Sequence, residues 1–345
     1  MHNDTDNYNA PRRPGVGRAA DGEVNEMANR LELELADTPE LRAPVLLAAF
    51  AGWGDGAVAG TSALQYLIRK HDAEKLGAFD SDEVYQYTTT RPVTLQREDG
   101  ERELAWPTLE LHACRLPDAP HDLLLLVGPE PDLRWRACAE AIVDAARRCN
   151  ASAVVVLGSY WDQVSHLGQP LLSGRAADAG MRQALMALDV RESRYQGPTG
   201  FTSALLDACA RRELPAAGIS ARAPHYAQGI VHPQLSWALL RVVEQLADVR
   251  LDLAALEEAG REQARRLTER IQQEPKLWQY VQMVAAQHGQ LAAGNGPQQG
   301  PWATLAAPEV APDVPPRPDV GAELPSSAEM VEAVESFFRG SRREG

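Results

Sequence analysis

The chain has 345 residues and a formal net charge of -14 at pH 7, with 34 Lys and Arg against 48 Asp and Glu. This length allows a sizeable buried core in one large or two ordinary domains. The acidic balance argues against a surface for nucleic acid or for an anionic membrane, and no run of about 18 apolar residues predicts a membrane helix. The four cysteines are scattered without C-x-x-C spacing, which indicates reduced thiols and a cytoplasmic protein.

Residues 1–40 are polar and predict a disordered N-terminal arm, in which the Leu31–Leu35 alternation predicts a short edge strand. Residues 44–50 are apolar almost throughout and predict a strand that is buried on both faces. A glycine-rich turn and an amphipathic helix follow, with Asp55 placed to cap that helix. The sequence therefore opens with a strand-turn-helix unit.

The turn has part of a nucleotide-binding motif. Gly54, Gly56 and Ala59 fit the G-x-G-x-x-A form of the dinucleotide fingerprint. That fingerprint also needs an acidic residue at the end of the next strand, whereas Asp72 and Glu74 follow a predicted helix. We therefore interpret these glycines as a structural turn and assign no cofactor.

The middle of the chain predicts an α/β core over residues 41–250, with a mixed, mostly parallel sheet in a three-layer α/β/α arrangement. Short strands at 84–87 and 103–106 flank an Asp99-Gly100 pair, which is typical of a hairpin. Further strands are predicted at 121–127, 153–157 and 216–221, and helices at 133–149, 178–188, 201–212 and 234–246. Thr199 or Thr202 is placed to cap the helix that begins at 201.

Beyond the core the pattern is helical. Residues 251–290 predict a helical hairpin, and residues 291–325 are rich in Pro, Gly and Ala and predict an extended linker. Residues 326–345 begin with a capping box and predict a short amphipathic helix, with Met330, Val334, Phe337 and Phe338 on its apolar side. A helix this short needs a surface to dock on, so we interpret it as a partner-docking helix.

Little in the sequence indicates catalysis. Ser159 and His225, with Asp162 or Asp55, are the only set that could form a serine-type triad. No G-x-S-x-G elbow is present, so we assign no catalytic residue. The eight histidines are dispersed and lack metal-ligand spacing, and we assign no metal.

Polar and aromatic residues recur where the predicted strands end. Because the carboxyl ends of parallel strands meet at one edge of a sheet, these residues are predicted to line a cleft. The set is Trp53, Asp55, Ser159, Tyr160, Thr199 and His225. The alternative use of the same loops is a subunit interface, for which aromatic side chains are equally suited.

The order of four motifs resembles a known family. These are Gly52–Asp55, Leu157–Tyr160, Tyr195–Gly200 and Pro224–Tyr226. They resemble the proteasome assembly chaperone 2 family in its bacterial branch, over about residues 45–284. The resemblance implies a phosphorylase/hydrolase-like core with a helical C-terminal appendage, and similarity to subunits that guide proteasome rings together. The chain ends without the hydrophobic-Tyr-any-residue tail that some relatives use on proteasomes.

The leading hypothesis is a non-enzymatic protein that acts by protein-protein contact, as a homo-oligomer of three subunits or a multiple of three, with another protein as a further partner. The competing hypothesis is a small-molecule hydrolase- or phosphorylase-like enzyme, or a ligand sensor, that uses the cleft at the strand ends.

Overall fold

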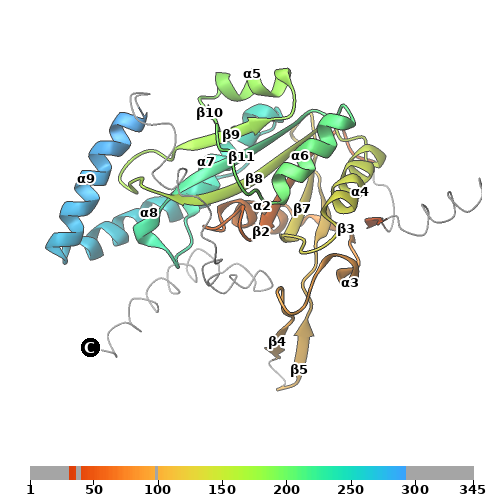
Figure 1. The fold of residues 1–345 in the computed structure, drawn as a ribbon, viewed down its shortest axis with the longest axis horizontal. Coiled ribbons are helices and arrows are strands. Elements are labelled where there is room, and N and C mark those ends of the chain that lie inside the picture. Colours follow the sequence, from red (N-terminus) through yellow and green to blue (C-terminus); the bar gives the residue numbers. More distant parts are fainter. Residues whose placement is uncertain (1–30, 36–39, 98–99, 293–345) are drawn as a thin grey trace, which may run out of the picture. The chain divides into compact units, whose positions relative to one another are not determined.

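A computed structural model describes residues 31–35, 40–97 and 100–292, and the account below concerns the unit that begins at Glu32. Its centre is a nine-stranded sheet in the order β1-β3-β6-β7-β2-β8-β11-β9-β10 (Figure 1). In chain order these strands are β1 (Glu34–Leu35), β2 (Val45–Ala51), β3 (Glu74–Ala78), β6 (Glu110–Cys114), β7 (Leu123–Pro129), β8 (Ala153–Asp162), β9 (Leu172–Ala176), β10 (Arg191–Glu192) and β11 (Ala216–Pro224).

The four central strands are parallel, and their apolar sequences explain why. β7, β2, β8 and β11 pair in parallel, and every residue of β2 and β7 is buried. Strands covered on both faces need such continuous apolar runs. Antiparallel strands flank them, with β6, β3 and β1 on one side and β9 on the other, and β10 pairs in parallel with β9. The sheet is therefore mixed, and the predicted parallel character belongs to its centre.

Helices cover both faces of this sheet. Residues of α2 and α7 share one hydrophobic cluster with every second residue of the central strands. On the opposite face Phe50 of β2 meets Phe201 of α6, with ring centroids 4.9 Å apart, and Phe201 also contacts Trp135 of α4. The helices of the core are α2 (Ala59–Lys70), α3 (Ser81–Val84), α4 (Trp135–Arg148), α5 (Ala179–Ala187), α6 (Phe201–Arg211) and α7 (Pro233–Leu246).

The region between α2 and β6 differs from the prediction. The strand expected at 84–87 is wrong, because Ser81–Val84 form the short helix α3, whose start is capped by the Asp80 carboxylate. The predicted hairpin is present, but its first strand lies later in the chain. β4 (Val93–Gln96) pairs with β5 (Arg102–Ala105) in a separate two-stranded sheet. We call this hairpin, residues 93–106, the arm.

Two helices follow the core, as expected for a helical hairpin. They are α8 (Ala254–Gln272) and α9 (Pro275–Ala292), and they pack on the chain after β11 through a small apolar cluster that includes Ala227, Leu267 and Val281. Among the described helices, none is long and apolar enough to cross a bilayer. Most of the predicted N-terminal arm, nearly all of the linker and the whole docking helix lie outside the described residues.

Gly60 lets α2 lie directly against β8. A Cβ atom added there would come within 2.5 Å of the main-chain oxygen of Leu157. Helix propensity alone would make Gly60→Ala favourable by roughly 1 kcal/mol. We instead expect a loss of about 1–3 kcal/mol in the free energy of unfolding, because the main chain of β8 would have to shift to make room for the added methyl group.

Thermal or urea unfolding tests this expectation, and Gly289→Ala in α9 is the matched control. Apart from the neighbouring backbone of α9, no atom of the described residues lies within 4 Å of a Cβ added at Gly289, so that variant should gain up to about 1 kcal/mol. A Gly60→Ala protein as stable as the control would contradict the close helix-strand approach.

Candidate functional site

The candidate site is the edge of the sheet where β2, β7, β8 and β11 end. Because these strands are parallel, their carboxyl ends meet there, which is where ligands bind in open α/β sheets. Buried polar residues gather at this edge, among them Asp55, Glu130, Ser159 and Asp162. What each of them contacts decides what the edge can do.

Asp55 and Ser159 form one buried unit at the start of α2. The Asp55 carboxylate accepts hydrogen bonds from the Gly60 amide at 3.0 Å, the Thr61 amide at 2.8 Å and the Ser159 hydroxyl at 2.5 Å. The Ser159 oxygen in turn accepts from the Ala59 amide at 3.3 Å. Burial raises the pKa of Asp55, while these hydrogen bonds act in the opposite direction. The first N–H groups of α2 are therefore satisfied internally.

Glu130 does the same for α6. Its carboxylate accepts a hydrogen bond of 2.6 Å from the amide of Phe201, the first residue of that helix. The expected cap by Thr199 or Thr202 is not what is found, and the exposed Thr199 contacts the Ser203 hydroxyl instead. Helix starts are the places where backbone N–H groups bind phosphate. At both helix starts described here, a carboxylate of the chain itself occupies that position.

The outer side of the same edge is aromatic. The Trp53 side chain is 62% exposed and Tyr195 is 41% exposed, with ring centroids 6.4 Å apart. We call these two side chains the aromatic rim. Tyr160 is also exposed, and its hydroxyl contacts Ser173 on β9. Exposed aromatic side chains at a loop edge are typical of surfaces that bind other proteins.

His225 faces the C-terminal helices. Its Nδ1 lies 3.1 Å from the Asp162 carbonyl oxygen, so it donates there, and its Nε2 accepts from the Tyr280 hydroxyl of α9 at 2.9 Å. The Asp162 carboxylate pairs with the buried Arg222 guanidinium at 2.7 Å. The predicted set is thus divided: Asp55 and Ser159 are in contact, while His225 is engaged elsewhere.

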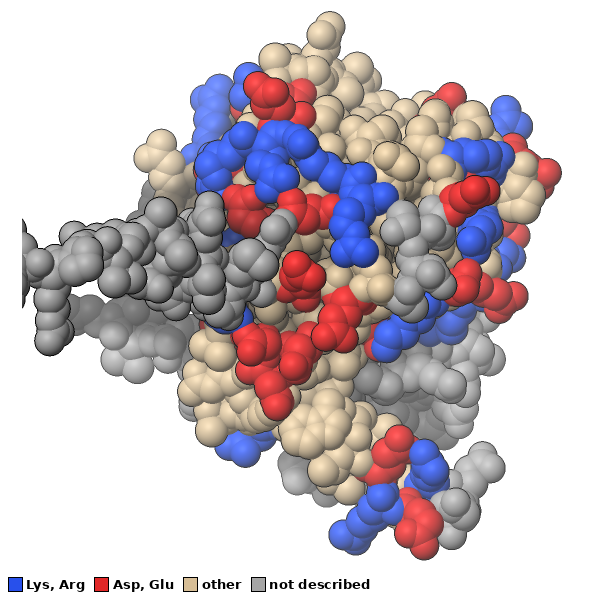
Figure 2. All heavy atoms as spheres, turned by 90° about the vertical axis from the view of Figure 1, so that its right-hand side faces the viewer, with Lys and Arg blue, Asp and Glu red and all other residues tan. Residues whose placement is uncertain are grey.

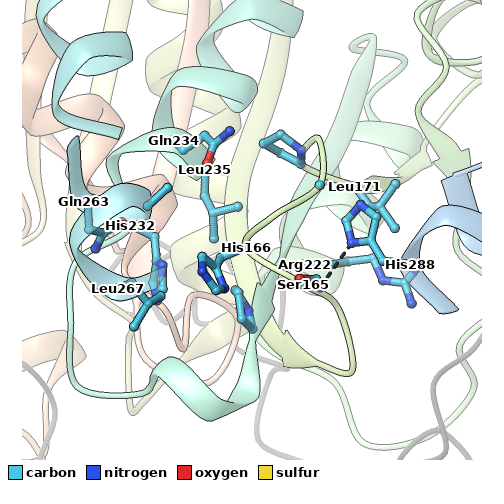
Figure 3. Close-up of a pocket in the computed structure, with 14 residues that line it drawn as sticks. Ser165, His166, Leu171, Arg222, His232, Gln234, Leu235, Gln263, Leu267 and His288 are labelled. Carbon is cyan, nitrogen blue, oxygen red and sulfur yellow. Dashed lines mark hydrogen bonds between the residues drawn. The ribbon is translucent and has the colours of Figure 1, made fainter. Parts of the chain in front are cut away.

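A second feature lies between the core and the helical hairpin. Ser165, His166, Arg222, His232 and His288 are among the residues that line a small cavity there (Figure 3). Its volume is about 20 Å³, which suits a water molecule and not a metabolite. Within the described part of the chain, no group of three His, Cys, Asp or Glu is arranged to hold a metal ion.

Two of the histidines of this cavity, His166 and His288, hold the hairpin against the core. His166 bridges the Tyr226 hydroxyl and the Thr268 hydroxyl of α8, at 2.6 and 3.0 Å. His288 of α9 accepts from the Ser165 amide at 3.2 Å and donates to the carbonyl of Gln169 at 2.9 Å.

The third histidine, His232, precedes α7, and its Nε2 donates to the Ala227 carbonyl at 3.0 Å. Burial lowers the pKa of His232 to about 4 and that of His166 likewise to about 4. Both rings are therefore neutral at pH 7.

The comparison with known families shows which family the chain belongs to. A model described as the PAC2 family matches residues 49–272, from β2 to the end of α8. The chain belongs to the PAC2 family. The resemblance that the strand-end motifs indicated is thereby confirmed.

Solved structures agree with membership of the PAC2 family. A PAC2 family protein from Streptomyces avermitilis is 32% identical, with a TM-score of 0.63 over 69% of this chain and 99% of that one. A proteasome-assembly chaperone homologue from Mycobacterium tuberculosis is 33% identical, with the same TM-score and the same coverage. PbaB, an archaeal proteasome activator from Pyrococcus furiosus, is 17% identical with a TM-score of 0.56 over 70% of this chain and 98% of its own, and shows the fold alone. A search of curated proteins found no match.

Sequence reasoning missed two of these features. Glu130 is 71 positions from the amide that it caps, so no local rule could pair them. Its only signal was an acidic residue directly after a buried strand. The cavity joins segments more than a hundred residues apart, as the contact between Ser165 and His288 illustrates, and no sequence pattern indicated it.

Proposed function

We propose that this PAC2-family chain acts by protein-protein contact, as a homo-oligomer, and catalyses no reaction. The observation that carries the proposal is the use of the polar groups at the strand ends. The helix starts of α2 and α6 are capped by the side chains of Asp55, Ser159 and Glu130, while the exposed side of the same edge presents the aromatic rim. An edge built in this way favours a protein surface over a small molecule.

Two further points support the proposal. The Mycobacterium tuberculosis relative is described as a proteasome-assembly chaperone homologue, which favours a role in protein assembly for this chain too. The four cysteines are free and buried, which suits a reducing cytoplasm. The subunit number that we expect is three or a multiple of three, and the helix at 326–345 remains the predicted second docking element.

The alternative is a hydrolase- or phosphorylase-like enzyme or a ligand sensor on the same phosphorylase/hydrolase-like core. It would need a reactive group facing an open pocket and free N–H groups for an oxyanion or phosphate. The Ser159 hydroxyl is fully buried and bonded to Asp55, and the described cavity has room for about one water molecule.

Two measurements on the full chain test the proposal. Light scattering should give a molar mass several times the 37.6 kDa of one chain. A panel of phosphate, nucleoside and carboxylate compounds should leave the melting temperature unchanged to within about 1 °C. A compound that did bind, at 100 times its Kd, would stabilise the folded chain by about 2.7 kcal/mol and raise the melting temperature measurably. A single-chain mass at tens of micromolar contradicts the oligomer. A ligand shift that His225→Ala abolishes would instead favour the sensor or enzyme.

A further inference from the structure

The arm packs as a separate element. Its strands β4 and β5 form their own two-stranded sheet and do not join the nine-stranded one. Figure 1 shows the arm extending away from the core. Figure 2, which views the right-hand side of Figure 1, shows the arm at the bottom, with charged side chains of both signs toward its end. A hairpin of two strands is marginally stable in water unless something packs on it.

The arm also exposes apolar side chains. Leu95 is 38% exposed, Leu104 52% and Trp106 50%. Arg102 and Leu104 are both exposed and two positions apart in β5, so they lie on the same face of the hairpin, and the exposed Trp106 follows the end of the strand. Trp106 contacts the Tyr87 ring at a centroid distance of 4.9 Å, which fixes the base of this stripe.

The hydrogen bonds of the arm show which backbone groups are left for a partner. The Arg97 amide donates to the carbonyl of Glu101, and the register pairs Leu95 with Glu103. Hydrogen-bonded and non-hydrogen-bonded pairs alternate in an antiparallel ladder. Glu103 therefore directs its N–H and C=O groups toward β4, and Glu101 directs its carbonyl there. Leu104, like Arg102, directs its N–H and C=O groups toward the open edge of β5, where no strand of the described chain is paired.

The open edge of β4 offers fewer backbone donors for a further strand than the edge of β5. By the same alternation, its outward positions are Thr94, Gln96 and, just before the strand, Pro92. Proline has no N–H to donate, and it typically protects a sheet edge from pairing. The edge of β5 has a donor at each outward position.

We propose that the arm pairs through β5 with β5 of a second copy of this chain, antiparallel, around a two-fold axis at Leu104. The inference deepens the proposed homo-oligomer and rests on it. A two-fold pairing fits six subunits, which is a multiple of three, and does not fit a single ring of three. The pairing is isologous, so both copies use the same residues of β5 for the contact. It makes one four-stranded sheet, β4-β5-β5-β4, from two hairpins that are marginal alone.

The side chains favour this register over those with an axis at Arg102 or Glu103. An axis at Ala105 sets Leu104 opposite Trp106 and separates the two Leu104 residues, so the cysteine test below distinguishes it. An axis at Arg102 places two arginines opposite each other, and an axis at Glu103 places two glutamates opposite each other, and like charges directly opposite destabilise a sheet. An axis at Leu104 places the two Leu104 side chains together. It also sets Arg102 of each copy opposite Trp106 of the other, a cation-aromatic pair.

A cysteine at the axis tests this geometry. The native cysteines are all buried, so a Leu104→Cys variant of the full chain has one new accessible thiol. Directly opposite residues are about 5.5 Å apart at their Cα atoms, within the range that a disulfide spans. Mild oxidation should convert most of the protein to a covalent dimer on a non-reducing gel. Gln96→Cys, exposed on the outer strand of the same hairpin, is the control and should stay single.

A second variant measures the contact without a cross-link. Leu104→Lys places two like charges at the axis and should weaken the association by about tenfold or more in light scattering, with an unchanged circular dichroism spectrum because the position is exposed. The proposal is overturned if wild type is oligomeric while Leu104→Cys stays single or Gln96→Cys cross-links as readily. If wild type is a single chain by light scattering, the proposed homo-oligomer is overturned together with the pairing of the arm. Light scattering of wild type therefore distinguishes failure of the pairing alone from failure of the homo-oligomer.

Discussion

Replacing Asp55 by alanine is expected to lower the free energy of unfolding by about 3–5 kcal/mol. The side chain is buried and satisfies the amides of Gly60 and Thr61 as well as the Ser159 hydroxyl. Alanine leaves these donors without a partner in a site that water does not reach, and each such buried group costs about 1–3 kcal/mol. The loss of the helix cap adds to this.

Urea unfolding of Asp55→Ala and of Asp118→Ala, as the matched control, measures the effect. Asp118 is exposed, so its replacement should change stability by less than about 0.5 kcal/mol. Asp55→Asn should lie between the two, because an amide keeps one acceptor oxygen. If Asp55→Ala were as stable as the control, Asp55 would be free for another role, and the ligand-binding alternative would regain support.

The central strands of the fold could be predicted because each of them is marked by its own run of apolar residues. Val45–Ala51 and Leu123–Pro129 are apolar throughout, and such runs are stable only between two layers of helix. The outer strands β3, β9 and β10 lack that signal. Glu74–Ala78 is half polar and Arg191–Glu192 has two charged residues, so these segments become strands only because a neighbouring strand offers hydrogen bonds.

The error at 84–87 has a local cause. Val84 and the tyrosines after it suggest a strand, because β-branched and aromatic residues favour one. The stronger signal lies just before them, where Asp80 is followed by Ser81, Asp82 and Glu83. The Asp80 side chain accepts from the Asp82 amide at 3.0 Å and starts a helical turn. A capping residue thus outweighed propensity over a short stretch.

The candidate site was predicted only as far as local rules extend. Asp55 was expected to cap the helix after its own turn, and it does so. Its partner Ser159 lies 104 positions away, and that contact needs the parallel pairing of two strands. The role of His225 depends on Tyr280, which reaches it only because α9 folds back on the core. Groups that meet through tertiary structure carry no joint signal in one sequence.

The stability of the fold around this cavity should depend on pH, and the buried His232 should contribute to that dependence. Its pKa of about 4 in the folded chain lies below the 6.5 of an exposed histidine, so between these values the unfolded chain binds more protons. The stabilisation is complete above about pH 6.5 and is lost progressively as the pH falls toward 4. For a group shifted this far, the whole effect is about 3 kcal/mol.

The charged groups around His232 do not offset that loss. His166, which faces it across the cavity, also becomes protonated as the pH falls, and each positive ring disfavours the other. The nearby Arg222 is paired with Asp162, so that carboxylate is already engaged. Protonation also gives the ring a second donor, and the Ala227 carbonyl accepts only the proton already on Nε2.

His232→Gln isolates this contribution, because the glutamine amide can still donate to the Ala227 carbonyl but does not titrate. Between pH 6.5 and 5.0, wild type should lose about 1.5 kcal/mol more of its free energy of unfolding than the variant, since one extra proton is worth about 1.4 kcal/mol per pH unit and the unfolded histidine is half protonated at pH 6.5. Urea unfolding at four or five pH values measures both slopes. At pH 7.5 the two proteins should agree to within about 1.5 kcal/mol, which separates a lost titration from a damaged core. Parallel pH curves would mean that His232 is protonated equally in the folded and unfolded states and does not stabilise the fold through its neutral ring.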